Sequence, residues 1–185
     1  RLARDRPKMP AEDHRPRLLL VDDEPTNLQV LRHVLQDDYR LLFATDGARA
    51  LQIAQQQKPQ LILLDVMMPG MDGYAVCAAL KAQRDTAGIP VIFVTALTDT
   101  AEETRGFDAG AVDYIAKPIN DHILHSKVRV FLDLWRARQA LHELTLDLQQ
   151  RNRQLEDEVR ERQRIEALVR HEAYHDSLTG LPNRV

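Results

Sequence analysis

Short apolar runs alternate with segments of helical periodicity from about residue 17 to residue 119. Runs that are rich in Leu, Ile and Val predict buried strands. Strands that alternate with helices along a sequence form parallel sheets. We therefore expect an α/β fold in which five strands build an open, parallel, doubly wound sheet. The predicted strands cover residues 17–22, 40–44, 61–65, 91–95 and 113–116.

Apolar residues between these runs recur at the spacing of a helix face. Leu28, Leu31 and Leu35 give the first helix its apolar side, and Ala50 and Ala54 do so for the second. A third helix is predicted from about residue 74 to residue 84 and a fourth from about residue 101 to residue 109. These helices suffice to cover both faces of the sheet.

The chain changes character beyond residue 120. Neither Gly nor Pro occurs from residue 121 to residue 177, and Leu, Gln, Glu and Arg dominate, which predicts one very long helix. Apolar residues recur along it at the heptad spacing of a coiled-coil seam, until the row reaches Arg162 and the stripe shifts phase. The seam residues are Leu134, Ala137, Leu141, Leu144, Leu148 and Leu155.

An exposed apolar row of this kind needs a surface that covers it. A second copy of the same helix supplies one, so we expect a parallel homodimer with a coiled coil over residues 133–174. The alternative is a helix that folds back on its own domain, whose sheet already has helices on both faces.

Composition limits the expected binding partners and cellular location of the protein. With 185 residues, 44% of them hydrophobic and 29% charged, the chain can bury one core of ordinary size and still supply the long helix. The net charge of −3 gives no whole-chain bias towards nucleic acid or an anionic membrane, and no apolar stretch reaches the roughly 18 residues of a membrane helix. A single cysteine, Cys77, placed among alanines and valine, fits a buried side chain in a cytoplasmic protein. We expect residues 1–16 to be a mobile tail and the chain, which begins with Arg1, to be part of a longer protein.

Three carboxylates stand where predicted strands end. Asp22 and Asp23 close the first apolar run, and Asp65 closes the third. In a doubly wound sheet the carboxyl ends of the strands line the ligand crevice, so acids from two strands can converge there. Such an oxygen cage suits a hard divalent cation, and one of the acids could accept a phosphoryl group. For any single acid the alternative is a helix cap or a solvated turn.

Four segments at different strand ends carry a resemblance to a known family. They are VDDEP at 21–25, LDVMMPGMDG at 64–73, VTA at 94–96 and YIAKP at 114–118. In this order and spacing they closely resemble the receiver domain of two-component response regulators, over residues 17–132. The resemblance implies a flavodoxin-like sheet and a phosphotransfer site served by a sensor histidine kinase or a phosphotransfer protein.

The resemblance also assigns a role to each acidic residue. Asp65 would be the phosphoacceptor, a carboxylate nucleophile that attacks phosphorus. Asp22, Asp23, Asp65 and the backbone carbonyl of Met67 would hold Mg²⁺. Without a cation three clustered carboxylates would repel one another and resist ionisation.

Three further residues receive roles in the same way. Lys117 would pair with a phosphoryl oxygen, and the peptide bond before Pro118 is commonly cis in the family. Thr95 would donate a hydroxyl hydrogen bond to the phosphoryl group, and Tyr114 would swing inwards as part of a two-state switch. The alternatives are a surface salt bridge for Lys117, a plain strand-end hydroxyl for Thr95 and ordinary packing for Tyr114.

The last residues resemble a different family. Residues 175–184 match the opening of GGDEF domains, the fold of diguanylate cyclases, with the string DSLTGLPNR, but the GGDEF signature itself occurs nowhere in the chain. We interpret 175–185 as the start of such an output domain. The string HEAYH at 171–175 also matches a zinc motif, which we reject because no third ligand accompanies it.

These expectations combine into one functional hypothesis. The chain would be a two-component response regulator in which phosphotransfer to Asp65 controls a dimeric helix linked to a diguanylate cyclase. Within signalling, the alternative is a degenerate GGDEF domain or a cyclic di-GMP phosphodiesterase as output. The alternative outside signalling is a non-catalytic dimerisation or binding module whose carboxylates hold a structural cation.

Overall fold

A computed structural model describes residues 15–96, 106 and 108–174, apart from the side chains of 171–174. The chain divides into two units, one ending at Trp135 and the other beginning at Arg136. Most of the expected tail at 1–16, most of the expected helix at 101–109 and the whole of 175–185 lie outside the described residues.

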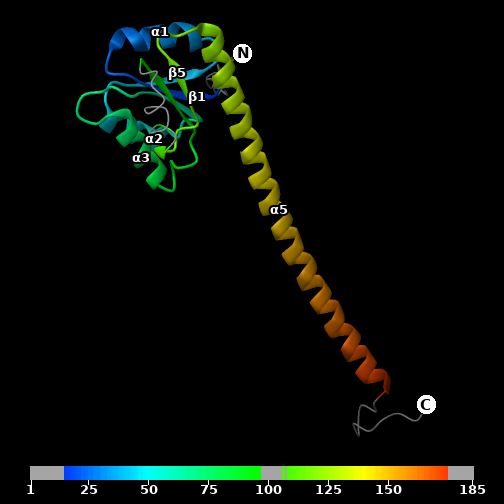
Figure 1. The fold of residues 1–185 in the computed structure, drawn as a ribbon. Helices are drawn as coiled ribbons and strands as arrows, with labels where there is room; N and C mark the ends of the chain where they lie inside the picture. The colour runs from blue at the N-terminus through cyan, green and yellow to red at the C-terminus, as the bar shows by residue number, and fades with distance from the viewer. Residues whose placement is uncertain (1–14, 97–105, 107, 175–185) are drawn as a thin grey trace, which may run out of the picture. The chain divides into compact units, whose positions relative to one another are not determined.

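The first unit contains a five-stranded sheet in the order β2-β1-β3-β4-β5, in which every neighbouring pair is parallel. The predicted fold class, a parallel doubly wound sheet followed by a long helix, is thereby confirmed (Figure 1). The strands are β1 (Arg17–Val21), β2 (Arg40–Ala44), β3 (Leu61–Asp65), β4 (Val91–Thr95) and β5 (Asp113–Ala116).

Strand β1 ends one residue earlier than predicted. Asp22 follows it, and its Oδ1 accepts a hydrogen bond of 2.9 Å from the backbone N–H of Glu24. An Asp side chain bonded to the backbone two residues on makes an Asx turn, which bends the chain out of the strand. The carboxylate of Asp22 is therefore fixed at the strand end.

Local sequence signals set where the helices begin. The described helices are α1 (Pro25–Leu35), α2 (Gly47–Gln57), α3 (Gly73–Ala82) and α5 (Asp121–Tyr174). Pro25 opens α1, and the carboxylates of Asp46 and Asp72 cap α2 and α3 by accepting from backbone N–H groups. Helix α3 stops at Ala82, two residues before the predicted end, because Gln83 is extended with φ −100° and ψ 127°.

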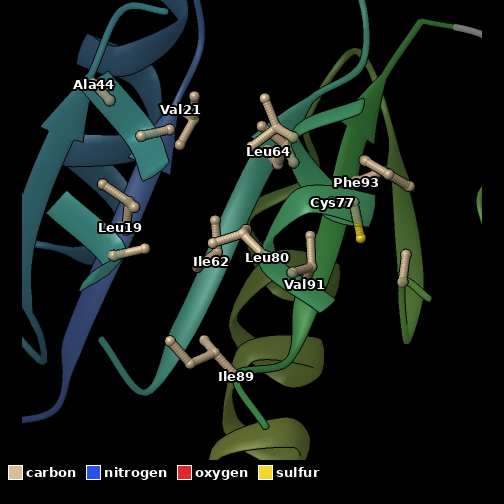
Figure 2. Packing of buried hydrophobic residues seen from close by; sticks show 14 of the residues in the cluster. Leu19, Val21, Ala44, Ile62, Leu64, Cys77, Leu80, Ile89, Val91 and Phe93 are labelled. Carbon is tan, nitrogen blue, oxygen red and sulfur yellow. The ribbon is translucent and has the colours of Figure 1, made fainter. Parts of the chain in front are cut away.

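The sheet is covered on both faces. One face packs against α2 and α3, where Leu19, Ile62, Cys77 and Val91 belong to a single buried cluster (Figure 2). The other face packs against α1 and the first turns of α5, and its cluster includes Leu28, Leu31, Leu124 and Val128. Residues of β1 and β3 alternate between the two clusters, as side chains of a strand buried on both faces must.

Helix α5 is 54 residues long and passes from the first unit into the second. Its predicted seam is solvent-exposed in the single chain, with side chains between 53% and 65% exposed at Leu134, Leu141, Leu144, Leu148 and Leu155. The coiled coil itself stays a prediction. Among the described residues, no helix combines the length and apolar character that a membrane crossing requires.

Candidate functional site

The strand register brings the three predicted carboxylates together. Val21 pairs with Leu64, so the residues that follow them, Asp22 and Asp65, lie level at the carboxyl edge of the sheet. One oxygen from each of Asp22, Asp23 and Asp65 lies within 4.8 Å of the others. Asp22 is 1% exposed and Asp65 5% exposed, whereas Asp23 is half-buried. The cluster therefore lies at the edge of the core and opens to solvent beside Asp23.

Asp22 is held by a network that the sequence did not predict. Besides the Glu24 N–H, its Oδ1 accepts a hydrogen bond of 3.0 Å from the side-chain amide of Asn27 in the first turn of α1. The Asn27 amide also donates to Glu24 at 3.2 Å. An Asn near a helix start is an ordinary capping residue in a sequence, so nothing in the pattern marks Asn27 as a partner of the cluster.

Lys117 bridges two of the acids. Its Nζ lies 2.8 Å from Asp22 Oδ2 and 3.2 Å from Asp65 Oδ1. The backbone N–H of Lys117 donates to the carbonyl of Thr95 at 2.8 Å, which ties the end of β5 to the end of β4. The Lys117–Pro118 peptide bond is cis, as the resemblance implied. The lysine thus reaches the cluster from the strand two places away from Asp65.

The electrostatics of the cluster follow from this arrangement. Burial raises the pKa of Asp65 above its usual value, the negative charge of Asp22 raises it further, and Lys117 acts in the opposite direction. Burial alone would lower the pKa of Lys117, but the hydrogen bond to Asp22 and the charge of Asp65 outweigh it, so that pKa is raised. Lys117 is therefore a firmly charged ammonium, and Asp65 is a carboxylate that gains from a further cation.

The donor set fits a magnesium ion. Three carboxylates offer the hard oxygen ligands that Mg²⁺ takes, and one oxygen of each lies within 4.8 Å of the others. Asp22, Asp23 and Asp65 are thus compatible with the predicted ion. Met67 lies two residues beyond Asp65 with its side chain 65% exposed, and the part expected of its backbone carbonyl stays a prediction.

The two predicted switch residues lie on neighbouring strands. Asp65 pairs with Val94, which places Thr95 one residue further along β4, and Thr95 is 6% exposed. Tyr114 on β5 is half-buried and pairs with Phe93. Their switching role stays a prediction: Thr95 lies on the strand next to the one that ends in Asp65, and Tyr114 lies on β5, three residues before Lys117.

Helix α5 contacts the strand that carries Tyr114. Lys127 Nζ lies 2.7 Å from Asp113 Oδ2 and 5.5 Å from the centroid of the Tyr114 ring. An ammonium at this distance from an aromatic face is attracted by the ring. No sequence pattern pointed to this contact, because a lysine on the polar side of a long helix looks like any solvated charge.

Gly73 allows the start of α3 to lie directly on the end of β3. A Cβ at this position would lie 2.2 Å from the backbone oxygen of Asp65 and 2.8 Å from the Cα of Val66. The Gly73 N–H donates to the carbonyl of Val66 at 2.9 Å. Only a residue without a side chain fits here, so Gly73 helps to fix the backbone that carries Asp65.

Together, the fold and the site define a flavodoxin-like α/β domain with an acidic, lysine-bridged crevice at the carboxyl ends of its strands. The chain belongs to the response regulator receiver domain family, whose model matches residues 18–129. Receiver domains are phosphorylated by histidine kinases or phosphotransfer proteins.

Similarity to individual proteins agrees with this family assignment. The response regulator PleD of Caulobacter vibrioides is 44% identical over 114 residues, which are 61% of this chain and 25% of that protein. A probable cyclic di-GMP phosphodiesterase of Vibrio cholerae is 40% identical over 124 residues, 67% of this chain and 28% of that protein. The solved structure of the Vibrio cholerae chemotaxis protein CheY4 matches with a TM-score of 0.61 and 30% identity, over 63% of this chain and 98% of that one. The chain thus spans about a quarter of the length of these two curated relatives.

Proposed function

We propose that Asp65 accepts a phosphoryl group from a phosphohistidine of a sensor kinase or phosphotransfer protein. In this step a carboxylate oxygen of Asp65 forms a bond to phosphorus, the phosphorus–nitrogen bond of the donor breaks, and the imidazole leaves with the electron pair. The observation that carries the proposal is the cluster of three carboxylates within 4.8 Å, bridged by Lys117 at 2.8 and 3.2 Å.

The surrounding residues prepare Asp65 for this reaction. Lys117 acts to lower the pKa of Asp65 and would pair with a phosphoryl oxygen, because its ammonium already lies within hydrogen-bond distance of Asp65. Asp22, Asp23, Asp65 and the carbonyl of Met67 would hold Mg²⁺, which supplies charge neutralisation and ligation of phosphoryl oxygens. Thr95, at the end of the next strand, would donate its hydroxyl to the transferred group.

The same residues offer a route from the site to the long helix. We expect phosphorylation to draw Thr95 towards the phosphoryl group and to move Tyr114. Since Lys127 of α5 contacts both the Tyr114 ring and Asp113, such a movement changes how α5 packs on β5. A switch of this kind needs a difference of only a few kcal/mol between two states.

We further propose a domain plan and an output. Residues 17–132 form the receiver, 133–174 pair with a second copy, and 175–185 begin a diguanylate cyclase that phosphorylation activates by bringing two copies face to face. The similarity to PleD and to a probable cyclic di-GMP phosphodiesterase supports an output in cyclic di-GMP signalling. We place the protein in the cytoplasm, without a nucleic-acid partner.

Incubation with acetyl phosphate tests the receiver function. With Mg²⁺ present, the intact protein gains one phosphoryl mass, and hydroxylamine removes it because the product is an acyl phosphate. Asp65→Asn gains none, whereas Asp46→Asn, which alters only the cap of α2, is labelled like the wild type. Labelling of Asp65→Asn at the wild-type level would refute the assignment of the acceptor.

Measurements on the longer protein separate the possible outputs. Formation of cyclic di-GMP from GTP, increased by beryllofluoride as a phosphoryl mimic, supports the cyclase. Hydrolysis of cyclic di-GMP instead supports the phosphodiesterase alternative. A protein that takes no phosphoryl group yet still dimerises is a binding module with a structural cation.

A further inference from the structure

The exposed face of α5 is hollowed beyond Leu148. A shallow groove there is lined by Asn152, Leu155, Glu156, Val159 and Arg160. Leu155 is 57% exposed and Val159 53% exposed, so this groove presents apolar walls to solvent in the single chain. The helix itself forms the floor of the groove, which lies within the predicted coiled coil at residues 133–174.

The first four of these residues stand at i, i+3, i+4 and i+7 along the helix. In a coiled coil this is the set of residues that surrounds a side chain inserted from the partner helix. The groove therefore has the composition of a hole that receives a knob. An apolar knob of leucine size suits walls made by Leu155 and Val159.

Asn152 also interrupts the apolar row in a particular way. Upstream of Leu148, the intermediate seam residues Ala137 and Leu144 follow a seam leucine by three residues. Downstream, Asn152 and Val159 follow a seam leucine by four. The spacing thus changes already at Leu148, ahead of the shift around Arg162, and this change puts the polar Asn152 into the row rather than beside it.

We propose that the second copy of this chain lies parallel and in register, with its own Leu155 in the groove and Asn152 facing Asn152. The inference rests on the proposed parallel homodimer and adds its register and the layer that fixes it. Facing asparagines can hydrogen-bond to each other across the interface. An antiparallel or slipped pairing puts Asn152 against an apolar residue and leaves its amide buried without a partner, which costs stability.

Charges beside the groove favour the same arrangement. Arg151 and Glu156 flank the row at the g and e positions, five residues apart, which is the spacing of attractive pairs between parallel helices. Within the single chain, Arg151 lies 3.0 Å from Asp147 and Glu156 lies 3.9 Å from Arg160. These side chains are half or more exposed, and exposed pairs contribute little, so they can be exchanged for pairs between two chains.

Cysteine cross-linking tests the direction and register. Leu134→Cys and Leu155→Cys are made singly, with Gln150→Cys as the matched control, since position 150 lies on the opposite side of the paired helix. In parallel, in-register dimers both seam variants form intermolecular disulfides under mild oxidation, and Gln150→Cys does so several-fold less. Buried Cys77 is left in place, and the wild type reports any contribution from it.

The possible cross-linking results lead to different conclusions. An antiparallel dimer cannot bring both position 134 and position 155 next to themselves, because it has one centre, and disulfides require Cα atoms within about 7 Å. Cross-linking at only one of the two seam positions, or equally at Gln150→Cys, overturns the inference while the homodimer stands. Sedimentation of the wild type as a monomer overturns the homodimer as well.

Substitution of Asn152 tests its role in choosing the register. Asn152→Leu makes the seam wholly apolar at this layer, so we expect loss of the single dimeric species and appearance of larger or mixed species in sedimentation. Gln150→Leu adds a leucine to the outer side and leaves a single dimer. If both variants remain single dimers with equal thermal midpoints, the role of Asn152 is refuted. Labelling of Asp65 by acetyl phosphate is measured on the same samples and reports independently on the receiver.

Discussion

The substitution Lys117→Met removes the cation that bridges Asp22 and Asp65 and keeps a side chain of similar length. Both acids are almost fully buried, and the lysine side chain is 21% exposed. At an effective dielectric constant of about 20, the contact at 2.8 Å corresponds to about 6 kcal/mol and the one at 3.2 Å to about 5 kcal/mol of Coulomb energy. The cost of burying the charges offsets a large part of these values.

Breaking a buried ion pair from one side typically costs about 3–5 kcal/mol, because the charge that stays behind loses its partner. The partial exposure of Lys117 admits water to the gap, so we expect the lower end of that range. Lys117→Met should therefore lower the free energy of unfolding by about 3 kcal/mol at pH 7 in a buffer with chelator. Two carboxylates that face each other without a cation account for this loss.

Urea unfolding followed by the fluorescence of Trp135, the only tryptophan, measures the effect in the first unit. Lys58→Met is the matched control, since Lys58 pairs with Asp85 at 3.8 Å between side chains that are 63% and 74% exposed, and it should cost less than about 1 kcal/mol. Adding Asp65→Asn to Lys117→Met should recover part of the loss. Equal stability of Lys117→Met and wild type, or a larger loss for Lys58→Met, would refute this reasoning.

Three further predictions concern stability and reactivity. Because the folded state raises the pKa of Asp65 above 3.8, ionised Asp65 destabilises the fold, so Asp65→Asn should unfold at higher urea than wild type at pH 7 without metal. That gain should shrink as the pH falls towards 3.8 and vanish below it, and a constant difference across the titration would contradict the pKa shift. Burial raises the pKa of Cys77 to about 11, although the charge of Lys81 acts to lower it. Iodoacetamide at pH 8 should therefore modify Cys77 at least about 100-fold more slowly in the native protein than in the unfolded chain. Comparable rates would argue against this burial. Gly73→Ala forces a Cβ into backbone atoms and should lower the free energy of unfolding by about 2–3 kcal/mol. The control Gly88→Ala, with no atom within 4 Å of its added Cβ, should change that free energy by less than about 0.5 kcal/mol. Equal effects of the two substitutions in thermal melts would exclude the steric cause.

The sheet was predictable because its strands are buried on both faces. A run such as Leu61–Asp65 is apolar almost throughout, and a parallel sheet between helices is the usual place for such runs. The ends were less predictable, since Asp22 leaves β1 through a side-chain hydrogen bond and Gln83 ends α3 by its backbone angles. Neither effect has a periodic signal in the sequence.

The acidic cluster could be predicted in part for a similar reason. The strand ends of a parallel sheet share one edge, so Asp22, Asp23 and Asp65 had to lie near one another once the strand order was right. The contact of Lys117 with both acids joins residues as far as 95 positions apart. The family resemblance brought Lys117 to this site as the partner of a phosphoryl oxygen and did not predict its contact with Asp22. The support from Asn27 depends on side-chain positions that no pattern of hydrophobic and polar residues encodes.

The dual contact of Lys117 has a consequence for how a signal would leave the site. The ammonium of Lys117 contacts Asp22 at 2.8 Å and Asp65 at 3.2 Å, so a phosphoryl group on Asp65 would compete with both carboxylates for its donors and would change its contacts. The backbone N–H of Lys117 donates a hydrogen bond to the carbonyl of Thr95. Tyr114 lies three residues before Lys117, and its ring contacts Lys127 of α5. A displacement at the acidic cluster would therefore reach α5 through covalently linked and hydrogen-bonded neighbours. The same helix carries the exposed seam that we propose a second copy covers. Lys127→Met tests the strength of this coupling, because it removes the contacts of α5 with Asp113 and the Tyr114 ring while the acidic cluster keeps all of its contacts.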